Sequence, residues 1–404
     1  MFNNKFVNIR CGAVRLMFAF AFVVLICGVA QASDRRLSPE KLYNKGEYMY
    51  EERRYDEALE YYVEAAIEGL VEAQYKAGYL YSKGIGTARN HKEAVRWFRQ
   101  AALQGHCDSQ YLLAGYYANG VGVAQDYKEA LKWYRSAAEQ GDDTSQFHVG
   151  VCYANGLGVE RDFKEAIRWF EKSAELGNVK AQYNLGVCYA NGKNSERDLA
   201  KAVRWYRKAA EQGYRNAEYS LGQCYAKGMG VEQDFKEAVR WYGIAAEHGD
   251  PYAECNLGHC YEYGDGVDID YEKAVEWYHK AAKHGSINAE YNLGHCYYLG
   301  RGVERDYVKA VEWYRVAADH GQVDAEYNLG LCCEQGEGVP QDYVEAVRWY
   351  RIAAEHGKAD AEYNLGRCYY LGHGVKQDSA EAEKWFRIAA KHGNMAAKEY
   401  LHDR

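Results

Sequence analysis

Histidine and cysteine are the residues of this chain that could bind a metal ion or attack a substrate, and both recur at a fixed spacing. Five histidines lie 36 residues apart: His248, His284, His320, His356 and His392. We expect each in the last turn of a helix, where a partly protonated imidazole interacts favourably with the negative end of the helix dipole. The pattern predicts structural histidines, with no metal site and no cofactor.

Seven cysteines form a second column with the same spacing: Cys152, Cys188, Cys224, Cys260, Cys296, Cys332 and Cys368. Equivalent helices of successive 36-residue units would lie roughly 10 Å apart, whereas a disulfide needs Cα atoms within about 7 Å. We therefore expect buried free thiols in this column. At most one disulfide can form among Cys107, Cys255 and Cys333, and the sequence does not say which two would pair.

Two short motifs resemble enzyme signatures, and neither is complete. Ser38-Pro-Glu-Lys41 matches the Ser-x-x-Lys of penicillin-recognising enzymes, but no Ser-Asp-Asn or Lys-Thr-Gly motif accompanies it. Serine before proline is instead typical of a helix N-cap. The repeated Gly-x-Gly-Val segments would join helix to helix, so they lack the strand that precedes a dinucleotide-binding loop. We predict no catalytic residues and no enzyme activity.

The elements that position these columns follow from the tryptophans, which fall on one arithmetic series. The nine residues are Trp97, Trp133, Trp169, Trp205, Trp241, Trp277, Trp313, Trp349 and Trp385. An alanine stands three residues before each of them and a glycine eight residues after each. A period of 36 residues is the signature of a repeat architecture, and we place nine copies in residues 73–396.

Each repeat has the pattern of two helices. In residues 289–298 the apolar side chains fall at helical spacing, and the helix is expected to end at Gly300, followed by a second glycine, Gly302. These glycines recur in every copy but one, where Asn194 replaces the second glycine and also tolerates a left-handed backbone. The second helix is expected to begin after an N-cap: Asn90, Asp126, Asp162, Asp198, Asp234, Asp270, Asp306, Asp342 and Asp378. Its face of alanines around a tryptophan suits close packing of a neighbouring helix, with the indole filling the remaining space.

One helix pair is too small to bury its own apolar face, so the copies must stack. The predicted fold is an all-α, α/α superhelical solenoid of tandem helix-turn-helix repeats. Residues 33–72 form a shorter unit with the pattern of a plain tetratricopeptide repeat, and we expect it to cap the N-terminal end. Residues 397–404 are expected to form the C-terminal capping segment.

The first 32 residues have the pattern of a cleavable secretory signal. A positive segment precedes an uncharged apolar run, and Ala30-Gln31-Ala32 is a small-x-small cleavage pattern. The run is shorter than a membrane span needs, so an uncleaved anchor is the weaker alternative and the only membrane contact that the sequence suggests. Cleavage would leave 47 basic and 58 acidic residues, a formal charge of −11. An acidic, exported chain, periplasmic or secreted, is not expected to bind nucleic acid.

The repeat pattern, Ala-Glu-Tyr-Asn-Leu-Gly-x-Cys-Tyr followed by the glycines, the acidic cap and the Trp-Tyr pair, resembles the Sel-1-like repeat family, relatives of tetratricopeptide repeats. The resemblance covers nearly the whole chain after residue 32. It implies an adaptor that binds other proteins. A cysteine-rich branch of the family has been described as β-lactamase-like, and this chain departs from that branch because it lacks paired cysteines in each repeat.

By analogy with tetratricopeptide solenoids, the first helix of each repeat should line the concave face. The candidate groove residues are Tyr291, Asn292, His295, Tyr298, Tyr327, Asn328, Tyr363, Asn364, Arg367 and Tyr370. Asparagine amides can hold an extended peptide backbone, and tyrosines supply contact area at low entropic cost. The alternative is that both columns stabilise packing between repeats.

The predicted function is an extracytoplasmic scaffold that binds proteins or extended peptides through this groove. An envelope glycan-binding protein or a β-lactamase-like hydrolase is the alternative. A nucleophile, a base and oxyanion donors that converge in one pocket would favour the hydrolase, and a long groove without such convergence would favour the scaffold.

Overall fold

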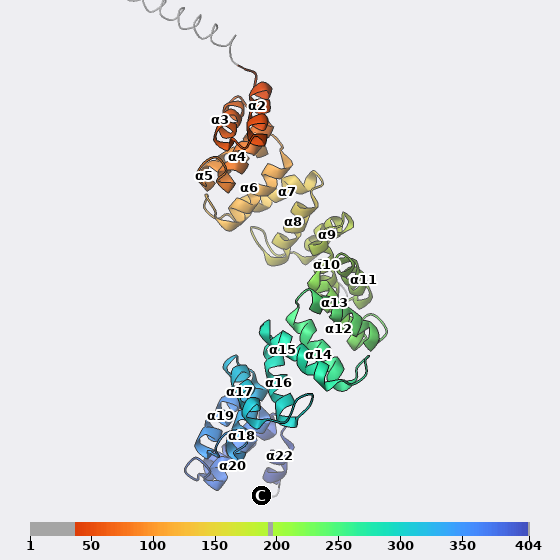
Figure 1. Cartoon of the computed structure of the whole chain (residues 1–404), viewed down its shortest axis with the longest axis vertical. Helices are drawn as coiled ribbons and strands as arrows, with labels where there is room; N and C mark the ends of the chain where they lie inside the picture. Colours follow the sequence, from red (N-terminus) through yellow and green to blue (C-terminus); the bar gives the residue numbers. More distant parts are fainter. Residues whose placement is uncertain (1–36, 193–196, 403–404) are drawn as a thin grey trace, which may run out of the picture. The chain divides into compact units, whose positions relative to one another are not determined.

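The computed structural model describes residues 37–192 and 197–402, and within these ranges it contains 21 α-helices and no strand (Figure 1). The predicted all-α repeat fold is confirmed. The predicted signal at residues 1–32 and the substitution at Asn194 lie outside the described residues. No helix in the described ranges combines the length and the apolar character that crossing a membrane requires.

The helices alternate between the first and the second helix of each repeat. The first helices are α2 (Pro39–Glu51), α4 (Val71–Lys83), α6 (Cys107–Asn119), α8 (Asp143–Asn155), α10 (Val179–Asn191), α12 (Arg215–Lys227), α14 (Pro251–Tyr263), α16 (Ile287–Leu299), α18 (Val323–Gln335), α20 (Ala359–Leu371) and α22 (Met395–His402). The second helices are α3 (Tyr55–Ile67), α5 (His91–Leu103), α7 (Tyr127–Glu139), α9 (Phe163–Glu175), α11 (Leu199–Glu211), α13 (Phe235–Glu247), α15 (Tyr271–Lys283), α17 (Tyr307–Asp319), α19 (Tyr343–Glu355) and α21 (Ser379–Lys391).

The chain forms two compact units, which are described separately. Unit 1 comprises residues 1–176, of which α2 to α9 are described, and unit 2 comprises residues 177–404, with α10 to α22. Within each unit a helix packs against the helix before it and the helix after it. The C-terminal helix α22 covers the last repeat, where the ring of Tyr400 lies 4.3 Å from that of Phe386. This helix begins two residues before the predicted capping segment.

The helix ends are fixed by the residues that the sequence singles out. Every predicted N-cap side chain accepts a backbone N–H of the first turn of its helix. Ser38 does the same at α2, with Pro39 at the first helical position. Gly300 ends α16 in the left-handed conformation, at φ 72°. At Gly302, φ 70°, a Cβ would collide with the backbone carbonyl of Tyr271, so only glycine fits this loop against the previous repeat.

The core corrects one expectation about the tryptophans. The most buried ring of a repeat is the residue after the tryptophan: Tyr278, Tyr314 and Tyr350 are at most 1% exposed. Each ring packs on a helical glycine of the same repeat, and a Cβ at Gly330 would lie 2.5 Å from the ring of Tyr350. Four tryptophans are buried, whereas Trp349 and four others are only partly buried. The indole therefore fills the space between helices together with the aromatic ring of the next residue, whereas we assigned that space to the indole alone in the sequence analysis.

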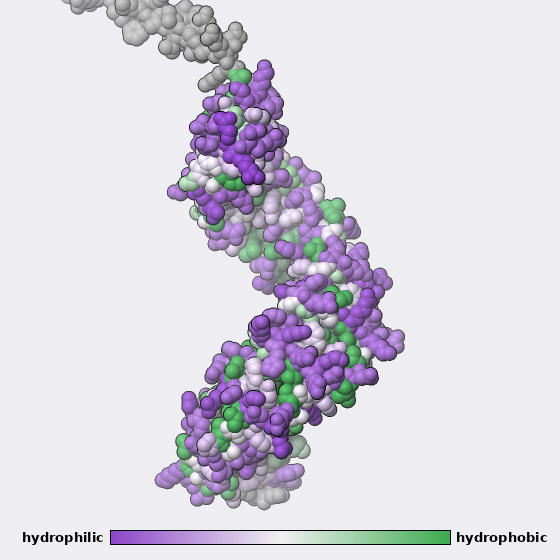
Figure 2. Space-filling view, viewed as in Figure 1, coloured by the Kyte–Doolittle hydropathy of each residue, from purple (hydrophilic) through white to green (hydrophobic). Residues whose placement is uncertain are grey.

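The cysteine column packs as predicted. All ten cysteines in the described ranges are free thiols, and those of the column are buried except Cys188, which is partly buried. Burial raises the pKa of the Cys224 thiol to about 11 and that of Cys296 to about 12. Figure 2 shows that the visible surface is largely hydrophilic, with hydrophobic residues scattered in small groups.

Candidate binding face

The predicted tyrosines line the first helices of unit 2 and are half-buried. The rings of Tyr291 and Tyr327 lie 5.8 and 6.0 Å from the buried rings of Tyr314 and Tyr350. Tyr363 lies 5.5 Å from the Phe386 ring in the same way. Burial raises the pKa of Tyr291 and of Tyr327. Part of each ring therefore serves the core of its own repeat, and the remainder is open to a ligand.

The predicted asparagines connect neighbouring repeats. Asn364 is buried, and its Nδ2 donates a hydrogen bond of 3.4 Å to the hydroxyl of Tyr327, 37 residues earlier. Asn328 and the Tyr291 hydroxyl form a side-chain hydrogen bond at the same sequence separation. Asn292 Nδ2 instead lies 3.8 Å from Sγ of Cys255, because a cysteine stands where all but one of the other repeats have a tyrosine. These contacts give the asparagines a role in packing between repeats, which was the alternative stated in the sequence analysis.

The other predicted groove residues form local pairs with neighbours. His295 stacks near Tyr291 at 6.2 Å, and burial lowers the pKa of its imidazole. Tyr298 donates a 2.8 Å hydrogen bond to Glu337 of the next repeat. Arg367 donates to Oδ1 of Asn364 at 3.2 Å.

The remaining groove residue, Tyr370, is exposed and lies edge-on to Tyr400 of α22. The ten predicted residues therefore lie in several small clusters on α16, α18 and α20.

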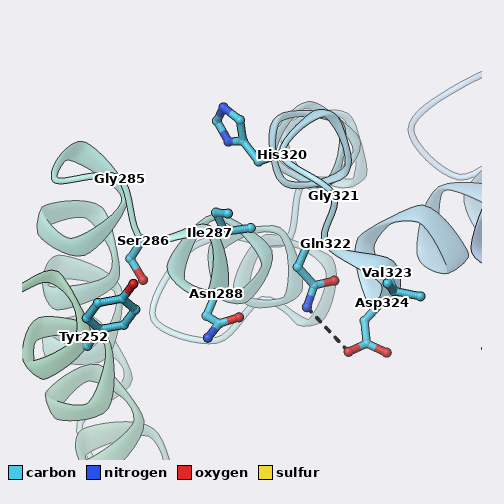
Figure 3. Close-up of a pocket in the computed structure, with 10 residues that line it drawn as sticks. All are labelled: Tyr252, Gly285, Ser286, Ile287, Asn288, His320, Gly321, Gln322, Val323 and Asp324. Carbon is cyan, nitrogen blue, oxygen red and sulfur yellow. Dashed lines mark hydrogen bonds between the residues drawn. The ribbon is translucent and has the colours of Figure 1, made fainter. Parts of the chain in front are cut away.

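A cavity of about 460 Å³ lies at the N-terminal ends of α14, α16 and α18 (Figure 3). Tyr252, Asn288 and Asp324 occupy the same position of three successive repeats, and Gln322 Nε2 donates to Asp324 at 3.5 Å. In Figure 3, Asn288, Gln322 and Asp324 point toward the same side of the helices. Asn288 lies one helical turn before Asn292, so the cavity continues the predicted stripe. We call these three positions and the predicted groove residues the candidate face.

The charges beside the cavity are partly neutralised. Asp324 Oδ1 lies 2.7 Å from Nζ of Lys358, and this hydrogen bond raises the pKa of the lysine. Asp360, the equivalent residue of the next repeat, accepts a 2.8 Å hydrogen bond from Asn394. Tyr252 is 58% exposed and Asn288 is exposed. These two uncharged side chains are therefore accessible at the cavity wall.

Sequence reasoning missed the cavity and the buried carboxylates beside it. The predicted histidines do end the second helices, but each Nδ1 also contacts a buried glutamate 30 residues earlier, at 2.8 Å. His320, which lines the cavity, pairs with Glu290, and that hydrogen bond raises the pKa of the imidazole. A comparison of the repeats could have revealed this pairing. The N-terminal repeats carry glutamine at the position of Glu290, and none of these repeats carries histidine at the position of His320.

The cavity contains a serine, a histidine and an aspartate, but they do not converge. Figure 3 shows the ring of His320 directed away from Ser286 and Asp324. Its Nδ1 is occupied by Glu290. Nowhere in residues 37–192 and 197–402 do three histidine, cysteine or acidic side chains gather in a way that could hold a metal ion. The arrangement suits contact with a ligand rather than nucleophilic attack.

Comparisons with known proteins agree with the repeat pattern. A family model described as the Sel1 repeat matches ten segments: residues 33–70, 71–106, 107–142, 144–178, 179–214, 215–250, 251–286, 287–322, 323–358 and 359–394. The first segment lies within the predicted N-terminal capping repeat. No curated protein matched the chain.

Two solved structures are similar over most of their length. One is a protective antigen present in uropathogenic Escherichia coli strains, described as displaying an SLR fold. It is 33% identical over 91% of this chain and 87% of its own, with a TM-score of 0.64. The other is a Sel1 repeat protein from Oxalobacter formigenes, 34% identical over 76% of this chain and 89% of its own, also with a TM-score of 0.64.

Proposed function

The chain belongs to the Sel1 repeat family, and on that premise we propose that it is an exported scaffold that binds partner proteins along the candidate face of unit 2. Sel1 repeat proteins are generally scaffolds for protein–protein interactions. The observation that carries the proposal is the cavity at Tyr252, Asn288 and Asp324, which continues the stripe of half-open tyrosines. An extended partner segment would lie across α14, α16 and α18, with one side chain in the cavity.

The hydrogen bonds of the face decide which substitutions can test it. Replacing Asn328 or Asn364 would disturb packing, so lost binding would be ambiguous. Tyr252 and Asn288 are exposed, so replacing them changes the surface with little effect on folding. Tyr48 of α2, 57% exposed against 58% for Tyr252, is the matched control in unit 1.

The test is capture of partners from a cell-envelope extract with the wild-type chain, the Tyr252→Ala/Asn288→Ala variant and the Tyr48→Ala variant. We expect the double variant to lose a partner that the other two retain, with a melting temperature within a few degrees of wild type. Retention of every partner by a folded double variant would remove this face from the mechanism.

Export is the second part of the proposal. A positive segment, an apolar run and a small-x-small cleavage pattern support it. N-terminal sequencing of protein purified from its own cells should return Ser33. A chain that retains Met1 and remains in the cell interior would contradict export.

A further inference from the structure

Unit 1 carries two adjoining cavities that differ from the one in unit 2. Their volumes are about 380 and 420 Å³, and they share His91, Leu112 and Tyr116 as a common wall. The first is also lined by Tyr111, Gly115, Asn119, Val121, Tyr134 and His148, and the second by Tyr75, Tyr79, Ser82, Lys83, Arg89 and Phe98. The lining comes from helices α4 to α8 and the loop before α5, in the orange to yellow part of Figure 1.

The first cavity is open because one repeat departs from the common pattern. Gly115 stands where the next two repeats carry Val151 and Val187. A Cβ at Gly115 would meet only the Tyr134 hydroxyl, at 3.8 Å. Leu112 replaces the asparagine that links repeats in unit 2. The missing side chain and the missing inter-repeat hydrogen bond leave a hollow lined by rings.

The rings of this hollow are already paired with one another. Tyr134 and His148 stack at 4.7 Å with an interplanar angle of 9°. Tyr75, which lines the second cavity, lies 4.8 Å from the ring of His106 at a tilt of 31°. The faces that Tyr134 and His148 turn toward each other are closed to a ligand, and Leu112 and Val121 add aliphatic side chains to the wall of the first cavity. Such walls suit large apolar side chains better than sugar rings, which stack on open aromatic faces.

The lysine and arginine side chains that line the two cavities lie in the second one. Lys83 and Arg89 line the second cavity, and no aspartate or glutamate is among the residues that line either one. This is notable in a chain with a net charge of −8. A ligand that complements these walls is apolar in its body and negatively charged at the end nearest Lys83 and Arg89.

We propose that the two cavities bind an extended segment of a partner protein that carries two large apolar side chains at alternate positions and an acidic residue beside them. Alternate side chains of an extended segment point to the same side, which fits two cavities with a common wall. The site extends the proposed scaffold function to unit 1. The site shares no residue with the candidate face, so an experiment can disprove one of the two binding sites without affecting the other.

Gly115 provides the decisive variant. In Gly115→Leu the new side chain would fill the first cavity, and in Gly115→Ala it would leave most of the space open. Both replace a helical glycine, which favours the fold, so lost binding cannot be attributed to unfolding. A double charge reversal, Lys83→Glu/Arg89→Glu, tests the electrostatic half of the proposal.

The probe is a library of random displayed peptides selected on the full-length chain, with dissociation constants then measured by fluorescence anisotropy. We expect the enriched peptides to combine two large apolar residues at alternate positions with aspartate or glutamate. Their affinity should fall at least tenfold in Gly115→Leu and in the charge reversal, and less than twofold in Gly115→Ala. Tyr252→Ala/Asn288→Ala should leave it unchanged.

Three results would overturn the proposal. These are selection of no peptide whose binding depends on Gly115, enrichment of basic or wholly polar peptides, and displacement of bound peptide by neutral oligosaccharides but not by excess unlabelled peptide. Loss of binding in Tyr252→Ala/Asn288→Ala alone would instead place the peptide site on the candidate face of unit 2.

Discussion

The N-terminal and C-terminal repeats share one backbone but place different polar pairs at the same two positions. Near the N-terminus, Gln104 donates to the buried Gln74 at 2.9 Å, and the pairs Gln140–Gln110 and Gln212–Gln182 repeat this contact. In the last five repeats the buried residue is glutamate and its partner is histidine. The glutamates are at most 6% exposed, and the histidines are 45 to 54% exposed.

The difference shows how a repeat can keep its geometry and change its response to the solvent. A glutamine pair is neutral at every physiological pH. A buried carboxylate beside a half-exposed imidazole gains an ion pair only when the imidazole is protonated. Five repeats of unit 2 therefore pair an imidazole with a carboxylate, whereas the first repeat of unit 2 and two repeats in the described part of unit 1 have glutamine pairs. The asparagine column also differs between the two units, because its three positions in unit 1 are Lys76, Leu112 and His148.

The largest effect is expected from removing asparagines in unit 2. Asn292→Ala, Asn328→Ala and Asn364→Ala together should lower the free energy of unfolding by about 3 kcal/mol, at about 1 kcal/mol for each hydrogen bond. Urea unfolding measures the loss. Asn288→Ala, on the same helix as Asn292 but exposed, should change the value by less than about 0.5 kcal/mol. A triple variant as stable as wild type would mean that this column does not hold the repeats together.

An intermediate effect is expected from two helical glycines that occupy adjacent positions of the repeat. Gly330→Ala would place a methyl group 2.5 Å from the Tyr350 ring, which should cost about 1 to 3 kcal/mol through overpacking. Gly115→Ala, beside the open cavity of unit 1, should gain about 0.5 to 1 kcal/mol from helix propensity. The sign of each change can be read from chemical denaturation. If both substitutions shift stability in the same direction, the contrast between the units is wrong.

The smallest effect concerns pH. The hydrogen bond from Glu290 raises the pKa of His320 in the folded state, and the charge of Asp319 acts in the same direction. The stability that this pair contributes is therefore fully present below the ordinary imidazole pKa of about 6.5. It is lost as the pH rises through the folded value. Because the imidazole is half-exposed, solvent screens the pair and its contribution is modest.

Hydrogen exchange at several pH values, corrected for intrinsic exchange rates, tests this difference. Between pH 6 and pH 8.5 protection should decrease in α16 and α17, which carry Glu290 and His320, and stay constant in α4 to α7. The Glu290→Gln/His320→Gln variant, which copies the N-terminal pair, should reduce the pH dependence in α16 and α17. Equal pH dependence in α16 and α17 and in α4 to α7 would contradict a role for the Glu290–His320 pair.

The parts of the fold that were predictable are those set by local and recurrent residues. Acidic caps such as Asp342, left-handed glycines such as Gly300 and the 36-residue period each act within a few residues, so they appear directly in the sequence. The choice between Trp349 and Tyr350 as the buried ring was not predictable in this way. Adjacent aromatic residues point about 100° apart on a helix, and only packing against Gly330 decides which one enters the core.

The candidate site was less predictable because its contacts cross between helices. The Glu290–His320 contact joins residues 30 positions apart and follows no helical period, so it emerges only when repeats are compared with one another. The cavity at Asn288 and Asp324 depends on where successive turns end in space. The predicted tyrosines and asparagines do lie on the expected helices, but their partners in the neighbouring repeat had no local signal.

The proposed export would give the cysteine column a consequence for the lifetime of the protein. Thiols with a pKa near 11 or 12 contain almost no thiolate at neutral pH, and only the thiolate exchanges with disulfides such as oxidised glutathione. The six buried thiols of the folded column are therefore shielded from disulfide exchange, while the unfolded chain presents them. Oxidation of these six thiols would then follow the unfolding rate of the protein rather than the amount of oxidant.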